Sequence, residues 1–285
     1  MKRFLTYIVS GSFCFLFPFL LMADPPDPED VLDPVPDPGS YFFLQPYIGL
    51  GYSFMTTKPI RAVTNGEVSN TVIESGGGLG LDLGIDLGYA FNEHIATRVG
   101  LFYKRRSFSN SDTALGRCIS DFVEVSEPVN MDYCVVGDYL GLQAQFDVRF
   151  NKFFGYLGFA SALPLSVSYE ETDRIIDTST TCRYFEDGPD ATTEVTGSVT
   201  ENPGFDGLRH TLNIGAGYVH PLSKKKDLVF QLQYAHPLSN LLPANTTANL
   251  QNAAVDGSRT IPMTVNGAAR FGTLSATVGI RFNFL

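Results

Sequence analysis

Two carboxylates lie four residues apart in the segment GLGLDLGIDLGYAF (78–91). Asp82 and Asp86 share one parity of this alternating stretch, so on a β-strand both side chains point to the same face. Paired carboxylates can divide general acid and general base roles between them. A tight turn after this segment would, however, bring Lys104 opposite Asp82 and Arg98 diagonal to Asp86. We therefore expect salt bridges from this pair rather than acid–base catalysis.

The other residues that could do chemistry are scattered along the chain. None of the four histidines stands at a readable spacing from a serine or cysteine, and no cysteine or histidine pair has metal-ligand spacing. The sequence contains no phosphate-binding loop and no nucleophile elbow. We expect no enzyme activity, no cofactor and no metal site.

The elements that position these residues are β-strands, because period-2 alternation recurs along the chain and helical periodicity is nearly absent. In each alternating segment one parity is apolar, whereas the other carries glycine, amide and charged residues. The pattern predicts eight strands, at 43–54, 78–91, 95–106, 136–150, 153–169, 208–220, 228–235 and 273–285.

The one-sided alternation allows two folds. In a soluble sandwich the apolar faces would need a second apolar layer, whereas in a membrane barrel they meet lipid. A barrel lumen also spares each Arg or Lys a cost of up to about 2–4 kcal/mol at the bilayer centre, and its glycines suit a narrow cylinder. We therefore predict an all-β fold, an eight-stranded antiparallel up-and-down transmembrane β-barrel. Its expected lumen polar network comprises Asp82, Asp86, Arg98, Lys104, Gln143, Gln145, Asp147, Arg149, Gln231 and Arg281.

The predicted connections alternate between short and long, as expected for short periplasmic turns and long extracellular loops. The short ones are 92–94, 151–152 and 221–227, and the long ones are 55–77, 107–135, 170–207 and 236–272. The loop at 170–207 is strongly acidic, so it could recruit divalent cations or a basic partner, or simply be solvated. Pro164 falls inside a predicted strand, where it removes a ladder donor and requires a bulge or a position above the membrane.

The N-terminus has the layout of an export signal, because Lys2 and Arg3 precede an apolar run that reaches Ala23. A retained membrane anchor is the alternative. Residues 24–40 carry six prolines and six acidic side chains, which is typical of an extended tether. The predicted organisation is therefore a signal peptide at 1–23, a Pro/Asp-rich periplasmic linker at 24–40 and a barrel domain at 41–285.

Charge and cysteine content limit the partners and the compartment. The formal net charge is −10, which argues against nucleic acid as a partner. Three cysteines follow the predicted signal peptide, and an exported chain enters a compartment that permits disulfides. We favour a disulfide between Cys118 and Cys134, because both flank one predicted loop, with Cys182 free or paired in place of one of them.

Three segments carry a resemblance to known proteins. GDYLGLQAQFDVRF (137–150), LQYAHPLSNL (232–241) and the C-terminal TVGIRFNFL are similar to strands of the PorT-like outer-membrane β-barrel domain family. More broadly, the chain resembles small outer-membrane barrels of the OmpA and OmpX type. It differs from the family in having Gly141 and Gln143 where Glu and Pro are frequent, and in ending on Leu285 after Phe284.

These observations favour a non-enzymatic barrel of the cell outer membrane with a structural, adhesive or interaction role. We expect a monomer that contacts outer-membrane lipid and lipopolysaccharide and uses the barrel assembly machinery during biogenesis. The polar lumen leaves a narrow porin-like channel as an alternative, and the PorT-like resemblance implies a third, an accessory factor for protein secretion.

Overall fold

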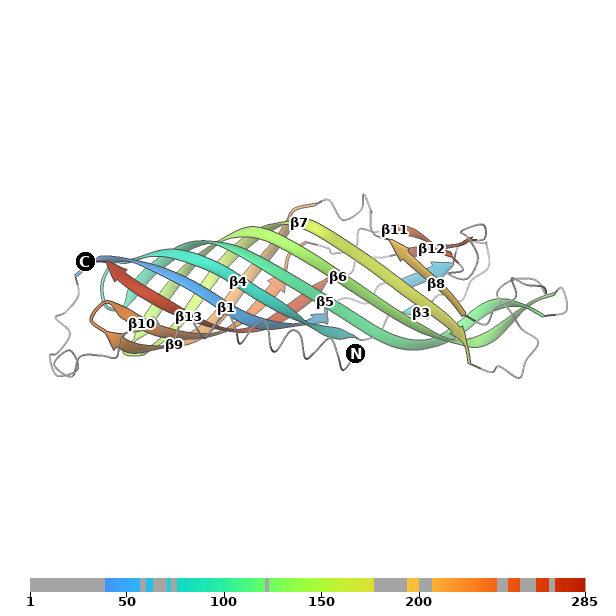
Figure 1. Ribbon diagram of the computed structural model, residues 1–285, viewed down its shortest axis with the longest axis horizontal. Coiled ribbons are helices and arrows are strands. Elements are labelled where there is room, and N and C mark those ends of the chain that lie inside the picture. The colour runs from blue at the N-terminus through green and yellow to red at the C-terminus, as the bar shows by residue number, and fades with distance from the viewer. Residues whose placement is uncertain are drawn as a thin grey trace.

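Each of the eight predicted segments forms a long strand in the computed structural model (Figure 1). The structure describes residues 39–56, 60–63, 71–72, 76–120, 123–176, 194–199, 207–239, 246–251, 260–266 and 270–284. The predicted signal peptide and almost all of the predicted linker lie outside these residues. The eight strands are β1 (Tyr41–Met55), β4 (Gly77–Ala90), β5 (Ile95–Ser120), β6 (Val123–Phe150), β7 (Phe153–Ile175), β9 (Arg209–Ser223), β10 (Lys226–Pro237) and β13 (Phe271–Phe284).

Antiparallel pairing joins these strands in chain order from β1 to β13. The first and last strands then pair with each other, from Phe42↔Phe284 to Met55↔Phe271. This pairing closes the eight strands into a barrel, so within the barrel each strand has a partner on both sides. The predicted eight-stranded antiparallel barrel is confirmed.

Three tight turns gather at one end of the barrel, where β13 also ends (Figure 1). In the first turn, the Asn92 side chain accepts hydrogen bonds from the backbone N–H groups of His94 and Ile95, both at 2.8 Å. In the second, Asn151 adopts the left-handed conformation with a φ of 55°, which asparagine tolerates better than most residues. We call this the short-turn end.

The opposite end, which we call the loop end, carries further strand structure. The β5–β6 ladder continues to Ser120↔Val123, although β4 stops pairing with β5 at Gly77↔Ser109. The prediction of a loop at 107–135 was therefore wrong. The ladder extends strands that are already paired, so it does not need the alternating apolar pattern on which the prediction rested. In Figure 1 the resulting hairpin projects beyond the barrel.

Five short strands extend the sheet from β7 at the loop end. They pair in the order β3-β2-β12-β11-β8, and β8 pairs with the loop-end part of β7, Tyr169–Arg174. These strands are β2 (Ile60–Val63), β3 (Thr71–Val72), β8 (Glu194–Val199), β11 (Thr246–Gln251) and β12 (Thr260–Asn266).

The two faces of the barrel strands have opposite chemistry. The outward face exposes large apolar side chains on every barrel strand, among them Leu79, Leu142, Leu157 and Leu232. The inward face buries polar and charged side chains as well as aromatic rings. Because such an exterior suits acyl chains and such an interior does not, the leucine-rich parity of 78–91 meets lipid and the Gly/Asp parity lines the lumen.

Aromatic and polar groups mark the two limits of the apolar exterior. Phe91, Phe150, Phe153 and Phe284 are all more than half exposed at the short-turn end, where exposed aromatic rings form the girdle typical of a membrane interface. Toward the loop end, the Asp138 carboxylate accepts hydrogen bonds on the outer face from the hydroxyls of Tyr103 at 2.6 Å and Ser166 at 2.9 Å.

Pro164 lies at an irregularity of the β6–β7 ladder. The register shifts between Asp138 and Tyr139, so that Tyr139 is opposite Pro164 whereas Asp138 is opposite Ser166. Leu165 is thus the extra residue of a β-bulge. The missing donor of Pro164 is accommodated at this bulge, as expected from the sequence.

Within the described residues, no helix is long and apolar enough to cross a membrane.

Candidate functional site

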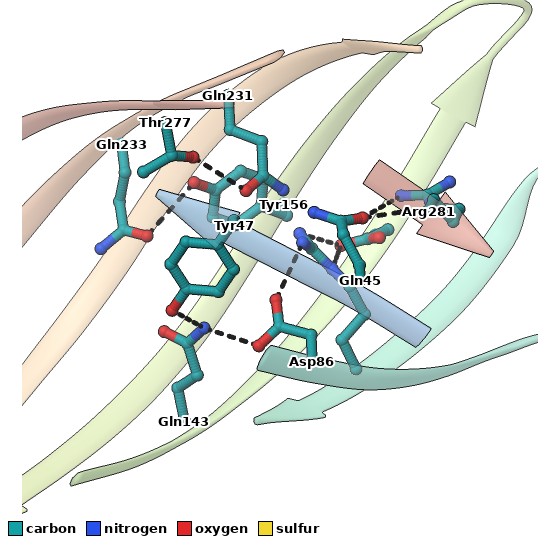
Figure 2. Close-up of polar contacts among 11 residues, drawn as sticks. Gln45, Tyr47, Asp86, Gln143, Tyr156, Gln231, Gln233, Thr277 and Arg281 are labelled. Atoms are coloured by element: carbon teal, nitrogen blue, oxygen red, sulfur yellow. Dashed lines mark hydrogen bonds and ion pairs between the residues drawn. The ribbon is translucent and has the colours of Figure 1, made fainter. Parts of the chain in front are cut away.

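A buried ionic network lies inside the barrel (Figure 2). Its centre is Arg98 of β5, whose Nε and Nη2 donate to one oxygen of Asp147 at 3.1 and 2.9 Å. Nη1 of the same guanidinium lies 3.4 Å from a carboxylate oxygen of Asp86. All three side chains are buried, so one guanidinium bridges two carboxylates inside the barrel, where leaving any of these charges without a partner would be costly.

Amide and phenol groups extend this network across the lumen. The Gln143 amide donates to Asp86 at 2.9 Å and to the Tyr47 hydroxyl at 3.0 Å. From the far wall, the Tyr156 hydroxyl donates to Gln233 at 3.3 Å, and its ring lies 5.1 Å from the Arg98 guanidinium. These contacts tie β1, β4, β5, β6, β7 and β10 together through the lumen (Figure 2).

Two further arginines are held by aromatic rings rather than by carboxylates. Nε and Nη2 of Arg281 donate to Gln45 at 3.1 and 3.0 Å, and its guanidinium lies 4.4 Å from the centre of the Phe43 ring. Arg149 donates to the Tyr41 hydroxyl at 2.8 Å and lies 5.4 Å from the same Phe43 ring. Cation–π contacts of this kind stabilise a desolvated guanidinium.

A second ionic layer lies nearer the loop end. Asp82 is opposite Lys104 in the ladder, as the sequence predicts, but its ion pair is with Arg106. The Lys104 amine lies 4.5 Å from the centre of the Phe102 ring. Cβ atoms at Gly51 and Gly80 would crowd the Arg106 guanidinium, so glycine at these positions makes room for the ion pair.

The structure places all ten predicted network residues on the inward face. Seven of them make the contacts given above, namely Asp82, Asp86, Arg98, Gln143, Asp147, Arg149 and Arg281. Gln145 is buried beside Arg98 in the register, and Gln231 lies 3.2 Å from the Thr277 hydroxyl. Among the contacts of the described residues, Lys104 has only its cation–π contact with the Phe102 ring.

Sequence reasoning missed several members of the network. Gln45 and Tyr47 fall on the polar parity of the first predicted strand, so the same parity rule could have included them. Arg106 is harder to find because Lys104, not Arg106, is opposite Asp82 in the register. Tyr156 is harder to find because its partner Gln233 lies on β10, which does not pair with β7.

The predicted disulfide between Cys118 and Cys134 is not formed, since Cys134 is a free thiol. The reason is the register, which sets Cys134 opposite Ser109 but Cys118 opposite Val125, near the tip of the hairpin. A disulfide needs neighbouring Cα atoms. Partial burial, and secondly the Glu170 carboxylate, raise the pKa of the Cys134 thiol above its ordinary value.

The described residues contain no group of three or more histidine, cysteine or acidic side chains that could hold a metal ion. Asp82 forms its ion pair with Arg106, and Asp86 shares Arg98 with Asp147. What this arrangement does chemically is neutralise charge and fill space inside the barrel.

A closed antiparallel barrel with an apolar exterior and a charged, packed interior is a transmembrane β-barrel.

No protein-family model and no curated protein matches the sequence. The fold is similar to that of Neisserial surface protein A, with 15% identity, a TM-score of 0.30, and coverage of 87% of this chain and 100% of that one. The outer membrane protease OmpT from Escherichia coli has 11% identity and a TM-score of 0.38 over 88% of this chain and 100% of its own. OprG from Pseudomonas aeruginosa has 11% identity and a TM-score of 0.32 over 88% and 99%.

Proposed function

We propose that this chain is a non-enzymatic barrel of the cell outer membrane that holds the β5–β6 hairpin above the membrane, in a structural, adhesive or interaction role. The observation that carries the proposal is the β5–β6 ladder, which continues from Asn110↔Tyr133 to Ser120↔Val123 beyond the last β4–β5 pair at Ser109. At 3.3 Å per residue this extension is about 35 Å long. The barrel anchors it, with lipid and lipopolysaccharide as neighbours and the assembly machinery as a partner during insertion.

The packing of the lumen supports a closed barrel rather than a channel. Arg98 joins carboxylates from β4 and β6, and Arg281 and Phe43 fill the space beside them. An eight-stranded barrel has room for side chains but hardly for a water column. Planar-bilayer recording separates the two functions, because a closed lumen gives no steady single-channel conductance whereas a narrow porin does. The double variant with Arg98→Ala and Tyr156→Ala, which removes two large side chains from the lumen, is the control. It shows whether the recording can detect an opened lumen.

The display role is tested by shortening the hairpin. In the variant, Ser111 and Asp132, which pair with each other, are joined by Asn-Gly. We expect it to insert normally, with unchanged heat-modifiable gel mobility, while attachment and aggregation of intact cells fall several-fold. A second variant replaces 112–131 by a Gly/Ser linker of equal length and keeps the reach without the ladder. Unchanged attachment in both variants would contradict the proposal.

The accessory role in secretion has a separate test. A deletion strain that secretes its cargo normally argues against it, whereas a secretion defect that the shortened hairpin fails to rescue favours it. This result does not depend on the conductance measurement.

A further inference from the structure

A cavity of about 120 Å³ lies in the lumen between the Arg98 network and the loop end. Its β5 lining begins four residues beyond Arg98 on the way to the loops, and seven of the eight barrel strands contribute to its wall. Its wall carries the rings of Phe102, Phe108, Tyr139 and Phe271 and three cationic side chains, Lys104, Arg106 and Arg209. We propose that this cavity binds a small aromatic carboxylate.

The wall of the cavity suits a flat apolar body. Phe102, Phe108 and Tyr139 are all buried, and the rings of Phe108 and Phe271 lie 4.5 Å apart. Ala160 and Ala162 line the cavity from β7, where larger side chains would fill the space. An apolar cavity of roughly 150 Å³ holds one benzene molecule, so the space corresponds to a single aromatic ring.

The lining of the cavity is cationic, so a ligand with a negative group is favoured. None of the described lining residues is an aspartate or glutamate. Arg106 is neutralised by Asp82, whereas Lys104 has no ion pair with any residue that the structure describes. Its amine lies 4.5 Å from the centre of the Phe102 ring, an arrangement that leaves its hydrogen-bond donors available. A carboxylate on the ring-shaped ligand would supply the missing acceptor in a poorly solvated place.

The aromatic rings in the wall determine which kind of anion fits the cavity. A phosphate or sulfate has no apolar body, whereas four aromatic rings line the cavity around the Lys104 amine, and Arg209 adds a further cation to the wall. A benzoate-like monoanion matches both features. This site goes beyond display of the hairpin and does not depend on it.

The test is calorimetric titration of the folded full-length barrel in an uncharged maltoside detergent, with benzoate, benzyl alcohol and benzylamine as probes. We expect benzoate to bind at least ten-fold more tightly than the other two. Lys104→Met should weaken benzoate about ten-fold, the loss of a charge-assisted hydrogen bond, and leave benzyl alcohol unchanged. Lys104→Glu should reverse the preference toward benzylamine, and Ala160→Leu should abolish binding of all three by filling the cavity.

Lys152→Met, in the exposed turn at the other end of the barrel, is the matched control and should bind as the wild type does. Heat-modifiable mobility shows that each variant is folded. No benzoate binding by the wild type, or binding that Lys104→Glu and Ala160→Leu both leave intact, overturns the proposal.

Discussion

Arg98 donates two hydrogen bonds to a single oxygen of Asp147, from Nε at 3.1 Å and from Nη2 at 2.9 Å, with both side chains buried in the lumen. Asp147→Asn keeps the shape of the side chain but removes its charge. We expect this variant to lose about 3 kcal/mol of unfolding free energy, at the lower end of the range for breaking a buried ion pair. Because the chain has no tryptophan, the measurement is urea unfolding of the reconstituted barrel followed by far-UV circular dichroism.

The matched control is Asp132→Asn, on the projecting hairpin opposite Ser111. Asp132 has no ion pair with a described residue, so its neutralisation should change the unfolding free energy by less than about 0.5 kcal/mol. Equal losses in the two variants would mean that the Arg98 contact does not stabilise the barrel.

The partner of Asp82 is the subject of the second prediction. Asp82 is opposite Lys104 in the ladder but forms its ion pair with Arg106. Double-mutant cycles with Asp82→Asn should therefore give a coupling energy of about 1–3 kcal/mol for Arg106→Leu and less than about 0.5 kcal/mol for Lys104→Leu. A larger coupling for Lys104 than for Arg106 would contradict the observed geometry.

The contacts of Asp82 also show which features of the site can be predicted from the sequence. Parity along each strand determines which side chains face the lumen, and a tight turn determines the register of neighbouring strands, so Asp82↔Lys104 was predictable. The choice between two cations on the same face depends on side-chain reach and local space. Arg106 extends far enough to approach the Leu81 carbonyl at 3.4 Å, through room that Gly51 and Gly80 leave.

Contacts between the first and last strands could not be predicted from the sequence, for a different reason. Arg281 and Gln45 are 236 residues apart and meet because the first and last strands pair. The predicted strands were too short wherever the ladder of backbone hydrogen bonds continues past the apolar alternation, as on β5 and β6. Hydrogen bonds between paired backbones continue there without a sequence signal.

The glycine pattern of the lumen gives the third prediction. A Cβ at Gly88 would overlap the ring of Phe43, which also contacts Arg281 and Arg149. Gly88→Ala should therefore cost about 1–3 kcal/mol through overpacking. Gly155→Ala is the control, because the nearest atom to its Cβ lies 3.8 Å away. Urea unfolding measures both, and equal stability of the two variants would show that the Phe43 ring moves aside freely.

The free thiol of Cys134 gives the last prediction, which is a pH dependence. Partial burial and the Glu170 carboxylate raise the pKa of the thiol, and the thiolate is the form that reacts with iodoacetamide. In a Cys118→Ser and Cys182→Ser background, alkylation at pH 8 should therefore be slower than for a free cysteine and should accelerate only at higher pH. Glu170→Gln removes the charge that disfavours the thiolate, so it should move this acceleration to lower pH.

Mass spectrometry of the labelled protein follows the rate, with Glu127→Gln, far along the hairpin from Cys134, as the matched control. Identical pH profiles for Glu170→Gln and the unmodified background would remove Glu170 as a cause. Failure of the unreduced, unfolded wild-type chain to react at this position would show instead that Cys134 is disulfide-bonded.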